Sequence, residues 1–413
     1  MNDDMRGNKT LFAIYAAGVM ILLLYSMHAY FLWWMYDDPR NQFFVDGLVA
    51  VIGIMYINSC KIPIRFNANV IAPFVIIWIA TAWNPIGISW IIQKCPFTLL
   101  TLLMVDKIDL QRLLSIWTKM YAWILLISLI AWPLALLGVI PSQGIISFGD
   151  EEGYVFQNFL FCIVNMNLVN FEVIRFCSIF LEPGHIAMIG AFTLYANRFD
   201  FKNWTTWVIF LVCLISVSLA GYVLMAVGYI LLKMQGSSFK KSSRAVLGGV
   251  IIITIGYFAA ITYKNGDNLI KEQIVDRLAY DEEKGIAGNN RFFGKTDDTF
   301  DMFLASQDFL TGFSKSKYSE YIQDRTIGGA GYKMYLMEMG LLGTLFAFVG
   351  YWLIAKRAIT KKYVKYFLLL YIIAFVQRSW PTTHIWLYLF VFATSVDYSM
   401  KNRTIQITHD SHL

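Results

Sequence analysis

The chain has 413 residues, of which 57% are hydrophobic, 16% aromatic and 15% charged, with a formal net charge of +6. Soluble domains contain about 45–50% apolar and about 25% charged residues, whereas here the apolar residues gather in blocks of roughly 15–25. This pattern excludes a water-soluble enzyme, a disordered chain and a disulfide scaffold, and it lacks the alternation of a transmembrane β-barrel. It predicts an all-α fold, a polytopic helical protein in a lipid bilayer, and the modest charge does not indicate nucleic acid.

The hydropathy pattern predicts twelve membrane spans. They cover approximately residues 11–33, 43–59, 68–83, 86–104, 120–140, 183–197, 204–219, 221–235, 245–262, 331–355, 363–377 and 385–400. The stretches 70–104 and 204–233 are each divided, at Asn84-Pro85 and near Ala220-Gly221, because each is too long for one crossing of a ~30 Å core. Each half is short, so a re-entrant or tilted pair is an alternative.

The distribution of Lys and Arg predicts the orientation, because basic residues are retained on the cytoplasmic side of the spans. Dividing 204–233 keeps Lys240, Lys241 and the segment KRAITKKYVK on that side. Both termini are therefore predicted to be cytoplasmic. The N-terminal segment lacks a small-residue cleavage site, so it is interpreted as part of the first span and not as a signal peptide.

Two long loops are predicted on the external side. They define three parts, namely a first membrane part over 1–263 with an external loop over 141–184, an external cap over 264–330, and the last three spans with a tail over 331–413. The cap contains twelve acidic and nine basic residues. Leu269 to Leu278 have helical periodicity, and Asp297 and Asp298 suit a helix N-terminus, so a folded cap is expected.

The chain contains none of the common nucleotide, protease or hydrolase motifs, such as a P-loop, HExxH or GxSxG. Its five histidines are scattered and its five cysteines lack metal-ligand spacing, so neither a metal nor a cofactor is expected. A bridge between Cys162 and Cys177, which share a predicted loop, is left open.

The remaining candidates for chemistry are arginines at the predicted outer face, namely Arg175, Arg291, Arg325 and Arg378. Guanidinium is always charged and fits phosphate oxygens bidentately, so these positions suit a lipid pyrophosphate or an anionic sugar. An arginine near a span end also snorkels to headgroups or pairs with a carboxylate. Asp46, Glu172 and Glu338 are expected to be structural partners of external arginines.

The sharpest local feature is Glu182-Pro183-Gly184-His185. Pro183 favours a first helical turn, the helix dipole tolerates an anion at Glu182, and His185 falls within that turn. An ordinary capped helix entry explains the glutamate and the proline equally well. A charged pair at membrane depth would indicate function.

These motifs resemble a known family. The run RFCSIFLEPG at 175–184 is similar to the Arg…Phe-x-Glu-Pro-Gly signature of the Wzy-type O-antigen and capsule repeat-unit polymerases. SVSLAGYVLMAVGYILL resembles their pair of short helices broken by Ser and Gly. YKMYLMEMGLLGTL, after the long loop, resembles their Glu-x-x-Gly-x-x-Gly helix entry. The layout matches over residues 10–400, but the motifs cover only about 170–235 and 289–345.

The resemblance implies a metal-independent glycosyltransferase of the bacterial inner membrane, active on its periplasmic or exterior side. Its donor and acceptor would be undecaprenyl-pyrophosphate-linked glycans, and a chain-length regulator and a repeat-unit flippase would be partners. Arg175, Glu182 and His185 would be catalytic, and Arg291, Arg325 and Arg378 would bind substrate. Arg291 and Arg325 each precede nearby glycines, so which of them acts is left open.

Two alternatives remain. A ligase-type transferase of the same superfamily is one, although Gly329-Ala330-Gly331-Tyr332 stands where the ligases commonly have His-Asn. The other is a secondary transporter or flippase for a polyprenyl-linked or small anionic substrate. The chain shows no two-fold hydropathy repeat, which many transporters have.

Overall fold

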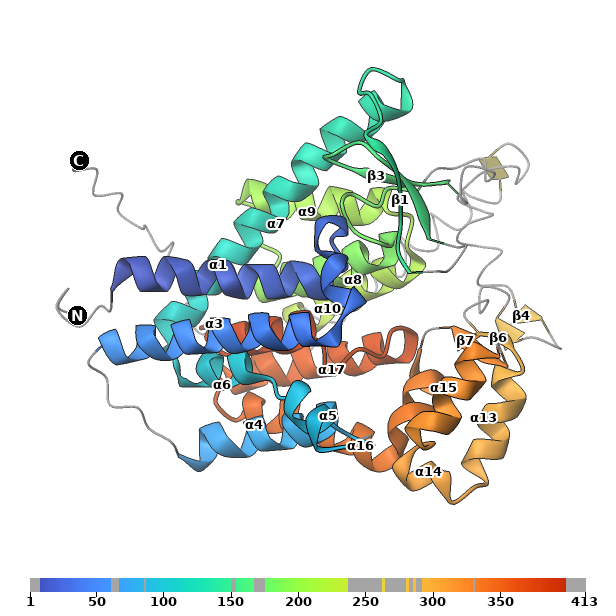
Figure 1. Ribbon diagram of the computed structural model, residues 1–413. Helices are drawn as coiled ribbons and strands as arrows, with labels where there is room; N and C mark the ends of the chain where they lie inside the picture. The colour runs from blue at the N-terminus through green and yellow to red at the C-terminus, as the bar shows by residue number, and fades with distance from the viewer. Residues whose placement is uncertain are drawn as a thin grey trace.

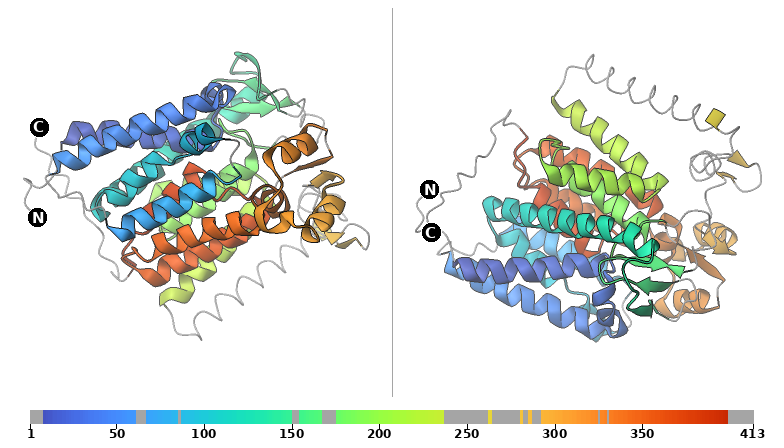
Figure 2. Two further views of the ribbon diagram at one scale, coloured as in Figure 1. Left: turned by 60° about the horizontal axis from the view of Figure 1, so that its bottom comes forward. Right: turned by 90° about the horizontal axis from the view of Figure 1, so that it is seen from above.

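The computed structural model describes residues 8–60, 67–84, 87–149, 154–166, 175–236, 262–263, 280–281, 285–286, 292–324, 326–329 and 331–398. This part of the chain is mostly helical, as the sequence predicts. Figure 1 shows the helices as a bundle with a small sheet and a group of short helices at one end, and Figure 2 shows the same arrangement from two other sides. We call this end the cap end.

The bundle helices overlap every predicted span except the ninth, which lies almost wholly outside the described residues. They are α1 (Lys9–Ser26), α3 (Pro39–Ser59), α4 (Ala68–Thr81), α5 (Ile88–Gln93), α6 (Phe97–Met104), α7 (Lys107–Leu136), α8 (Pro183–Ala196), α9 (Trp204–Ile215), α10 (Leu219–Gly236), α16 (Tyr332–Ala355), α17 (Lys361–Gln377) and α18 (His384–Ala393). Between α1 and α3 lie the short η2 (Tyr30–Leu32) and α2 (Trp34–Asp37).

Four helices in the described ranges are long and apolar enough to cross a membrane, at Lys9–Ser26, Arg40–Ser59, Lys107–Leu136 and Tyr332–Ala355. Other apolar helices are shorter, so the count of twelve crossings and the side of the termini stay predictions. The apolar helices nonetheless indicate a membrane protein.

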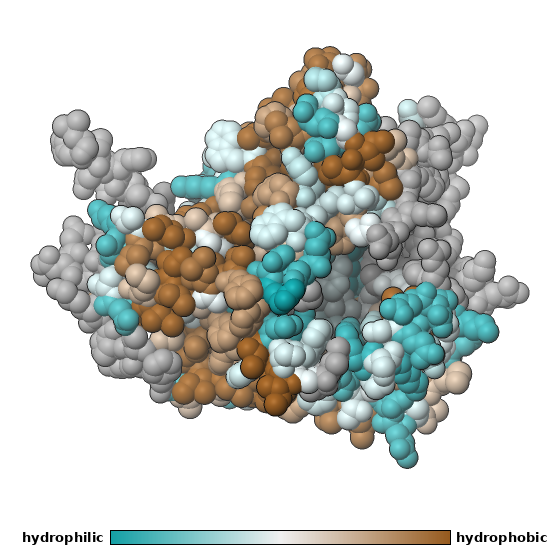
Figure 3. All heavy atoms as spheres, viewed as in Figure 1, coloured by the Kyte–Doolittle hydropathy of each residue, from teal (hydrophilic) through white to brown (hydrophobic). Residues whose placement is uncertain are grey.

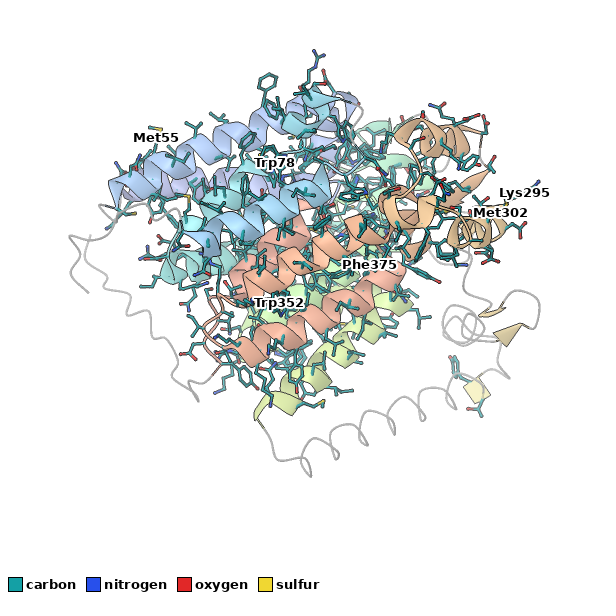
Figure 4. The ribbon with its side chains drawn as sticks, turned by 90° about the horizontal axis from the view of Figure 1, so that it is seen from below. Met55, Trp78, Lys295, Met302, Trp352 and Phe375 are labelled. Atoms are coloured by element: carbon teal, nitrogen blue, oxygen red, sulfur yellow. The ribbon has the colours of Figure 1, made fainter. Side chains whose placement is uncertain are left out.

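The outward face of α3 is an apolar surface of the kind that contacts lipid. Phe44, Leu48, Val51 and Met55 recur at helical spacing and are 51–66% exposed. Figure 3 shows hydrophobic surface over much of the bundle and hydrophilic surface over the short helices of the cap end. Met55 on α3 and Trp352 on α16, labelled in Figure 4, lie on the bundle surface. Such continuous apolar stripes are unfavourable in water and favourable in hydrocarbon.

The predicted fourth span is two helices, because Pro96 interrupts it between α5 and α6. The carbonyl groups freed by the break have side-chain donors. The Trp78 indole donates to the Ile91 carbonyl at 2.8 Å, and the Thr81 hydroxyl donates to the Lys94 carbonyl at 2.9 Å. Polar backbone in an apolar bundle needs such partners.

The stretch 204–233 is also two helices, as predicted, but the break precedes the predicted position. It lies at Val217, whose φ of +48° is left-handed. Gly221 has a different role, because a Cβ there would lie 2.3 Å from the Ala187 Cβ. The glycine therefore lets α10 pack closely against α8.

The predicted external loop 141–184 contains an antiparallel sheet at the cap end, in the order β1 (Gly144–Ser147), β2 (Val155–Asn158), β3 (Ile163–Asn165). The register places Ile145 opposite Gln157. The Ile163 amide donates to the Ser178 carbonyl at 2.8 Å, which ties the sheet to the segment that enters α8.

The main described parts of the predicted cap, residues 292–324 and 326–329, are folded. They contain α13 (Thr296–Leu304), α14 (Asp308–Thr311), α15 (Lys315–Gln323) and the paired strands β6 (Phe292–Gly294) and β7 (Ile327–Gly329). Two further short strands, β4 (Tyr280–Asp281) and β5 (Gly285–Ile286), pair with each other. Asp297 and Asp298 lie in the first turn of α13, as predicted. The helix predicted from Leu269 to Leu278 lies outside the described residues.

The cap is fixed to the bundle where α16 is broken. A small core of Phe300, Phe303 and Phe313 continues into Met334 and Met337 of α16. The Asn84 amide, at the end of α4, donates to the carbonyl groups of residues 311, 313 and 338 at 2.8, 3.2 and 3.1 Å.

Two glycines permit this contact. Gly340 has φ of +65° inside α16, and a Cβ there would lie 2.3 Å from the Gly312 amide nitrogen. A side chain at this position would strain the backbone and separate the two segments.

Gly340→Ala is therefore expected to destabilise the protein by about 2–4 kcal/mol, measured as a lower midpoint of thermal unfolding in detergent. The matched control is Gly47→Ala in α3, where a Cβ meets nothing within 4 Å. That variant should unfold at or slightly above the wild-type temperature, since Ala favours helix over Gly. Equal midpoints for the two variants would contradict the proposed close approach.

Candidate functional site

Three of the predicted site residues, Glu182, His185 and Arg378, lie together at the cap end. Glu182 directly precedes α8, His185 lies in its first turn, and Arg378 directly follows α17. Arg378 Nη2 donates to Glu182 Oε2, and the Tyr154 hydroxyl donates to Glu182 Oε1 at 2.8 Å. His185 Nε2 lies 4.0 Å from Glu182 Oε2. We call Tyr154, Glu182, His185 and Arg378 the site cluster.

Helix capping does not explain Glu182. Its side chain makes no hydrogen bond to the backbone of α8, although it stands at the N-cap position with Pro183 next. Both carboxylate oxygens are engaged across space by Arg378 and Tyr154 instead. The capped-entry interpretation is therefore wrong for the carboxylate, although Pro183 does start the helix as predicted.

Gly184 makes room for the arginine. A Cβ at Gly184 would lie 2.7 Å from Nη2 of Arg378 and 3.3 Å from its Cζ. The guanidinium therefore lies directly over the first turn of α8. The Glu-Pro-Gly sequence thus supplies an anion, a helix start and a space for the cation.

The electrostatics of Glu182 are set by opposing effects. Burial raises the pKa of the carboxyl, but the charge of Arg378 and the hydrogen bonds from Arg378 and Tyr154 lower it by more, so it lies well below its usual value. Glu182 is therefore a carboxylate at neutral pH and a weak base. Its chemical role is to hold and orient Arg378.

Sequence reasoning missed the aromatic residues and the second histidine beside the cluster. His28 lies in the turn after α1, with its ring centroid 5.4 Å from that of His185. Trp380 contacts His185 edge-on at 4.3 Å, and Tyr36 stacks on His28 at 4.6 Å. Tyr36 belongs to the aromatic run FLWWMY at 31–36, in which Trp34 is 54% exposed whereas Tyr36 is half-buried against His28. Of these residues, only Trp380 could have been found from the sequence, because it stands two positions after Arg378.

The backbone explains how His28 reaches this place. Ala29 and Phe180 form an isolated antiparallel bridge, and the Tyr30 amide donates to the Ile179 carbonyl at 3.0 Å. These bonds join the turn after α1 to the segment before α8. His28 itself has φ of +56°, a conformation that few residues other than glycine adopt.

Arg175 contacts the break between α9 and α10. Its Nε donates to the Ser216 carbonyl at 3.3 Å and its Nη2 to the Val217 carbonyl at 3.0 Å. The guanidinium thus satisfies carbonyl groups that the break leaves without helical partners. This contact is structural, and a catalytic role for Arg175 stays a prediction.

Other predicted residues have different outcomes. Arg291, Arg325 and Glu172 lie outside the described residues. Asp46 and Glu338 were expected to pair with arginines, which is wrong. Asp46 lies 3.4 Å from His384 Nε2, and Glu338 lies 2.7 Å from Lys315 Nζ.

All five cysteines are free thiols, so Cys162 and Cys177 form no bridge. In the parts of the chain that the structure covers, no group of three or more His, Cys, Asp or Glu side chains is placed to hold a metal ion. No family model, curated protein or solved structure matches the chain. The resemblance therefore depends on the motifs alone.

The site cluster makes a stability prediction. The side chains of Glu182 and Arg378 are only 25% and 13% exposed, so breaking the pair leaves an uncompensated charge. Glu182→Gln and Arg378→Met are each expected to cost about 3 kcal/mol, and the double variant less than their sum. Chemical or thermal unfolding in detergent measures this cycle.

The control is the pair Lys317–Asp308, whose side chains are 41% and 38% exposed; its removal should cost about 0–1 kcal/mol. Because folding lowers the pKa of Glu182, its stabilising contribution is complete above the ordinary value of 4.5 and is lost as the pH falls below it. The difference in stability between wild type and Glu182→Gln should therefore shrink from pH 7 to pH 3. Additive single variants with no pH-dependent difference would contradict this account.

Proposed function

We propose that this chain is an integral-membrane glycosyltransferase that polymerises undecaprenyl-pyrophosphate-linked repeat units into O-antigen or capsular polysaccharide. The observation that carries the proposal is the convergence of Glu182, His185 and Arg378 at the cap end. The sequence motif alone places Glu182 near His185, whereas Arg378 stands 196 positions after Glu182 in the chain. An ion pair of this kind in an apolar helical bundle is costly and favours a functional role.

The reaction would proceed by attack of an acceptor hydroxyl on the anomeric carbon of the donor glycan. The bond from that carbon to the pyrophosphate oxygen breaks, and the pyrophosphate leaves with the electron pair. Arg378, oriented by Glu182, has further N–H groups that would bind the leaving pyrophosphate. His185 would accept the proton of the attacking hydroxyl, because both oxygens of the neighbouring Glu182 carboxylate are already engaged by Arg378 and Tyr154.

Arg175, Arg291 and Arg325 remain proposed phosphate ligands. The bilayer and the cap would confine two lipid-linked substrates at one end of the bundle, which raises their effective concentration. In this proposal the cap end faces the periplasm or the exterior, and a repeat-unit flippase supplies the substrates there.

The proposal is tested in the host strain with the gene deleted and variants supplied in trans. The length distribution of the glycan is read by gel electrophoresis. Deletion should leave single repeat units attached to their acceptor. Arg378→Lys, which keeps the charge but loses the bidentate fork, is expected to lower polymer yield at least about tenfold.

The control is Arg40→Lys. Arg40 pairs with Asp38 but is 68% exposed and lies outside the site cluster, so its variant should give a normal ladder at equal protein level. A normal ladder from Arg378→Lys would refute the proposal. Loss of all attached glycan on deletion would instead indicate the ligase, and altered uptake with normal glycan would indicate a transporter.

A further inference from the structure

The pair His28 and His185 has unmet hydrogen-bonding capacity. His185 is only 2% exposed; its ring interacts with the Met27 backbone, but among the described residues neither ring nitrogen has a hydrogen bond of good geometry. The same holds for Nδ1 of His28, whose ring lies beside that of His185. A buried polar atom without a partner costs about 1–3 kcal/mol. Three such atoms in one place indicate a ligand that the folded chain alone does not supply.

Several rings and one ion pair surround the two imidazoles. Trp380 and Phe148 contact His28 at centroid distances of 6.3 and 5.3 Å, and Trp380 also contacts His185. Arg378 lies over the Trp380 ring at 5.1 Å. Glu182 and Arg378 act on both imidazoles, and the Tyr36 ring stacks on His28. The surroundings are therefore aromatic faces with a charge pair at one side.

This environment selects the charge of the ligand. Glu182 already neutralises Arg378, so the cluster offers a carboxylate no net attraction, and Glu182 repels it at close range. A cationic ligand would be repelled by the positive charge of Arg378. An uncharged ligand is therefore the one that these groups accept without an electrostatic penalty.

The imidazoles select its hydrogen-bonding groups. The charge of Glu182, the carboxylate beside these imidazoles, is already neutralised by Arg378, so the buried imidazoles are neutral. A neutral imidazole offers one N–H donor and one acceptor nitrogen. Hydroxyl groups both donate and accept, so two neighbouring hydroxyls can satisfy the three free nitrogens. The aromatic rings would cover the apolar face of a sugar.

We propose that His28, His185 and Trp380 form a subsite for one uncharged sugar residue that presents two neighbouring hydroxyls. The subsite rests on the proposed function in one respect, namely that the sugar belongs to the acceptor glycan whose hydroxyl His185 deprotonates. Its specificity excludes a uronic acid at this position.

The test is direct binding in detergent micelles, which needs no polymerisation. Saturation-transfer NMR is recorded with glucose, galactose, mannose, N-acetylglucosamine, rhamnose and glucuronate as probes. At least one neutral sugar should give a signal that weakens fivefold or more in His185→Phe and in His28→Asn. Phenylalanine keeps a ring at position 185, and asparagine tolerates the left-handed backbone at position 28. Glucuronate should give no signal that depends on either histidine.

Thermal unfolding of the same variants keeps the test interpretable. His185→Phe removes two unpartnered nitrogens, so it should unfold at or above the wild-type temperature. If it fails to fold, His185→Gln replaces it in the binding assay. Tyr363→Phe removes a buried hydroxyl that donates to the Tyr195 carbonyl at 2.9 Å, at the opposite end of α17 from Arg378. It serves as the binding control and should keep the full signal.

Signals that are equal in wild type and both histidine variants would overturn the subsite, and would mean that ordered water satisfies the nitrogens. A histidine-dependent signal from glucuronate would overturn the neutral specificity. A third outcome separates the two proposals. If a neutral sugar gives a histidine-dependent signal but deletion of the gene leaves the glycan unchanged, the subsite is kept and the polymerase is refuted.

Discussion

The ion pair between Glu182 and Arg378 is the constraint around which the cap end is arranged. It joins the start of α8 to the end of α17 across 196 positions of sequence. Gly184 leaves the space that the guanidinium occupies, and Tyr154, just before β2, reaches the same carboxylate from the sheet. The ion pair accounts for each of these features, whereas none of the features accounts for the others. The alternative, an unpaired charge in an apolar bundle, is too costly to persist.

The same pair determines what its neighbours can do. With Glu182 held by Arg378 and Tyr154, both carboxylate oxygens are engaged, and for this reason the proposed mechanism assigns the proton to the adjacent imidazole of His185. The bridge between Ala29 and Phe180 then brings His28 to the same place from the first helix. Three segments that are distant in sequence thus form one polar centre, while the surrounding side chains are aromatic.

The periodicity of apolar residues predicted most helices, because it depends on local sequence alone. The division of 204–233 followed from its length and from the distribution of basic residues, and the acidic first turn of α13 followed from the helix dipole. The apolar periodicity did not predict the break at Pro96 within 86–104, although proline is a local signal. The pairing partners were wrong for Asp46 and Glu338, because tertiary neighbours such as His384 and Lys315 are set by helix packing. His28 was missed because its left-handed backbone and the bridge from Ala29 to Phe180 leave no trace in sequence spacing.

Charge balance explains why the proposed reaction needs more than the site cluster. Glu182 and Arg378 sum to zero, so they can direct hydrogen bonds to a leaving pyrophosphate but cannot neutralise its charge. At least one further cation must approach when the bond to the sugar breaks. Arg175 lies at the α9–α10 break, where its guanidinium now binds two carbonyl groups, and Arg291 and Arg325 belong to the predicted cap loop. The proposed reaction therefore needs a second arginine besides Arg378, and Arg175, Arg291 and Arg325 are the candidates.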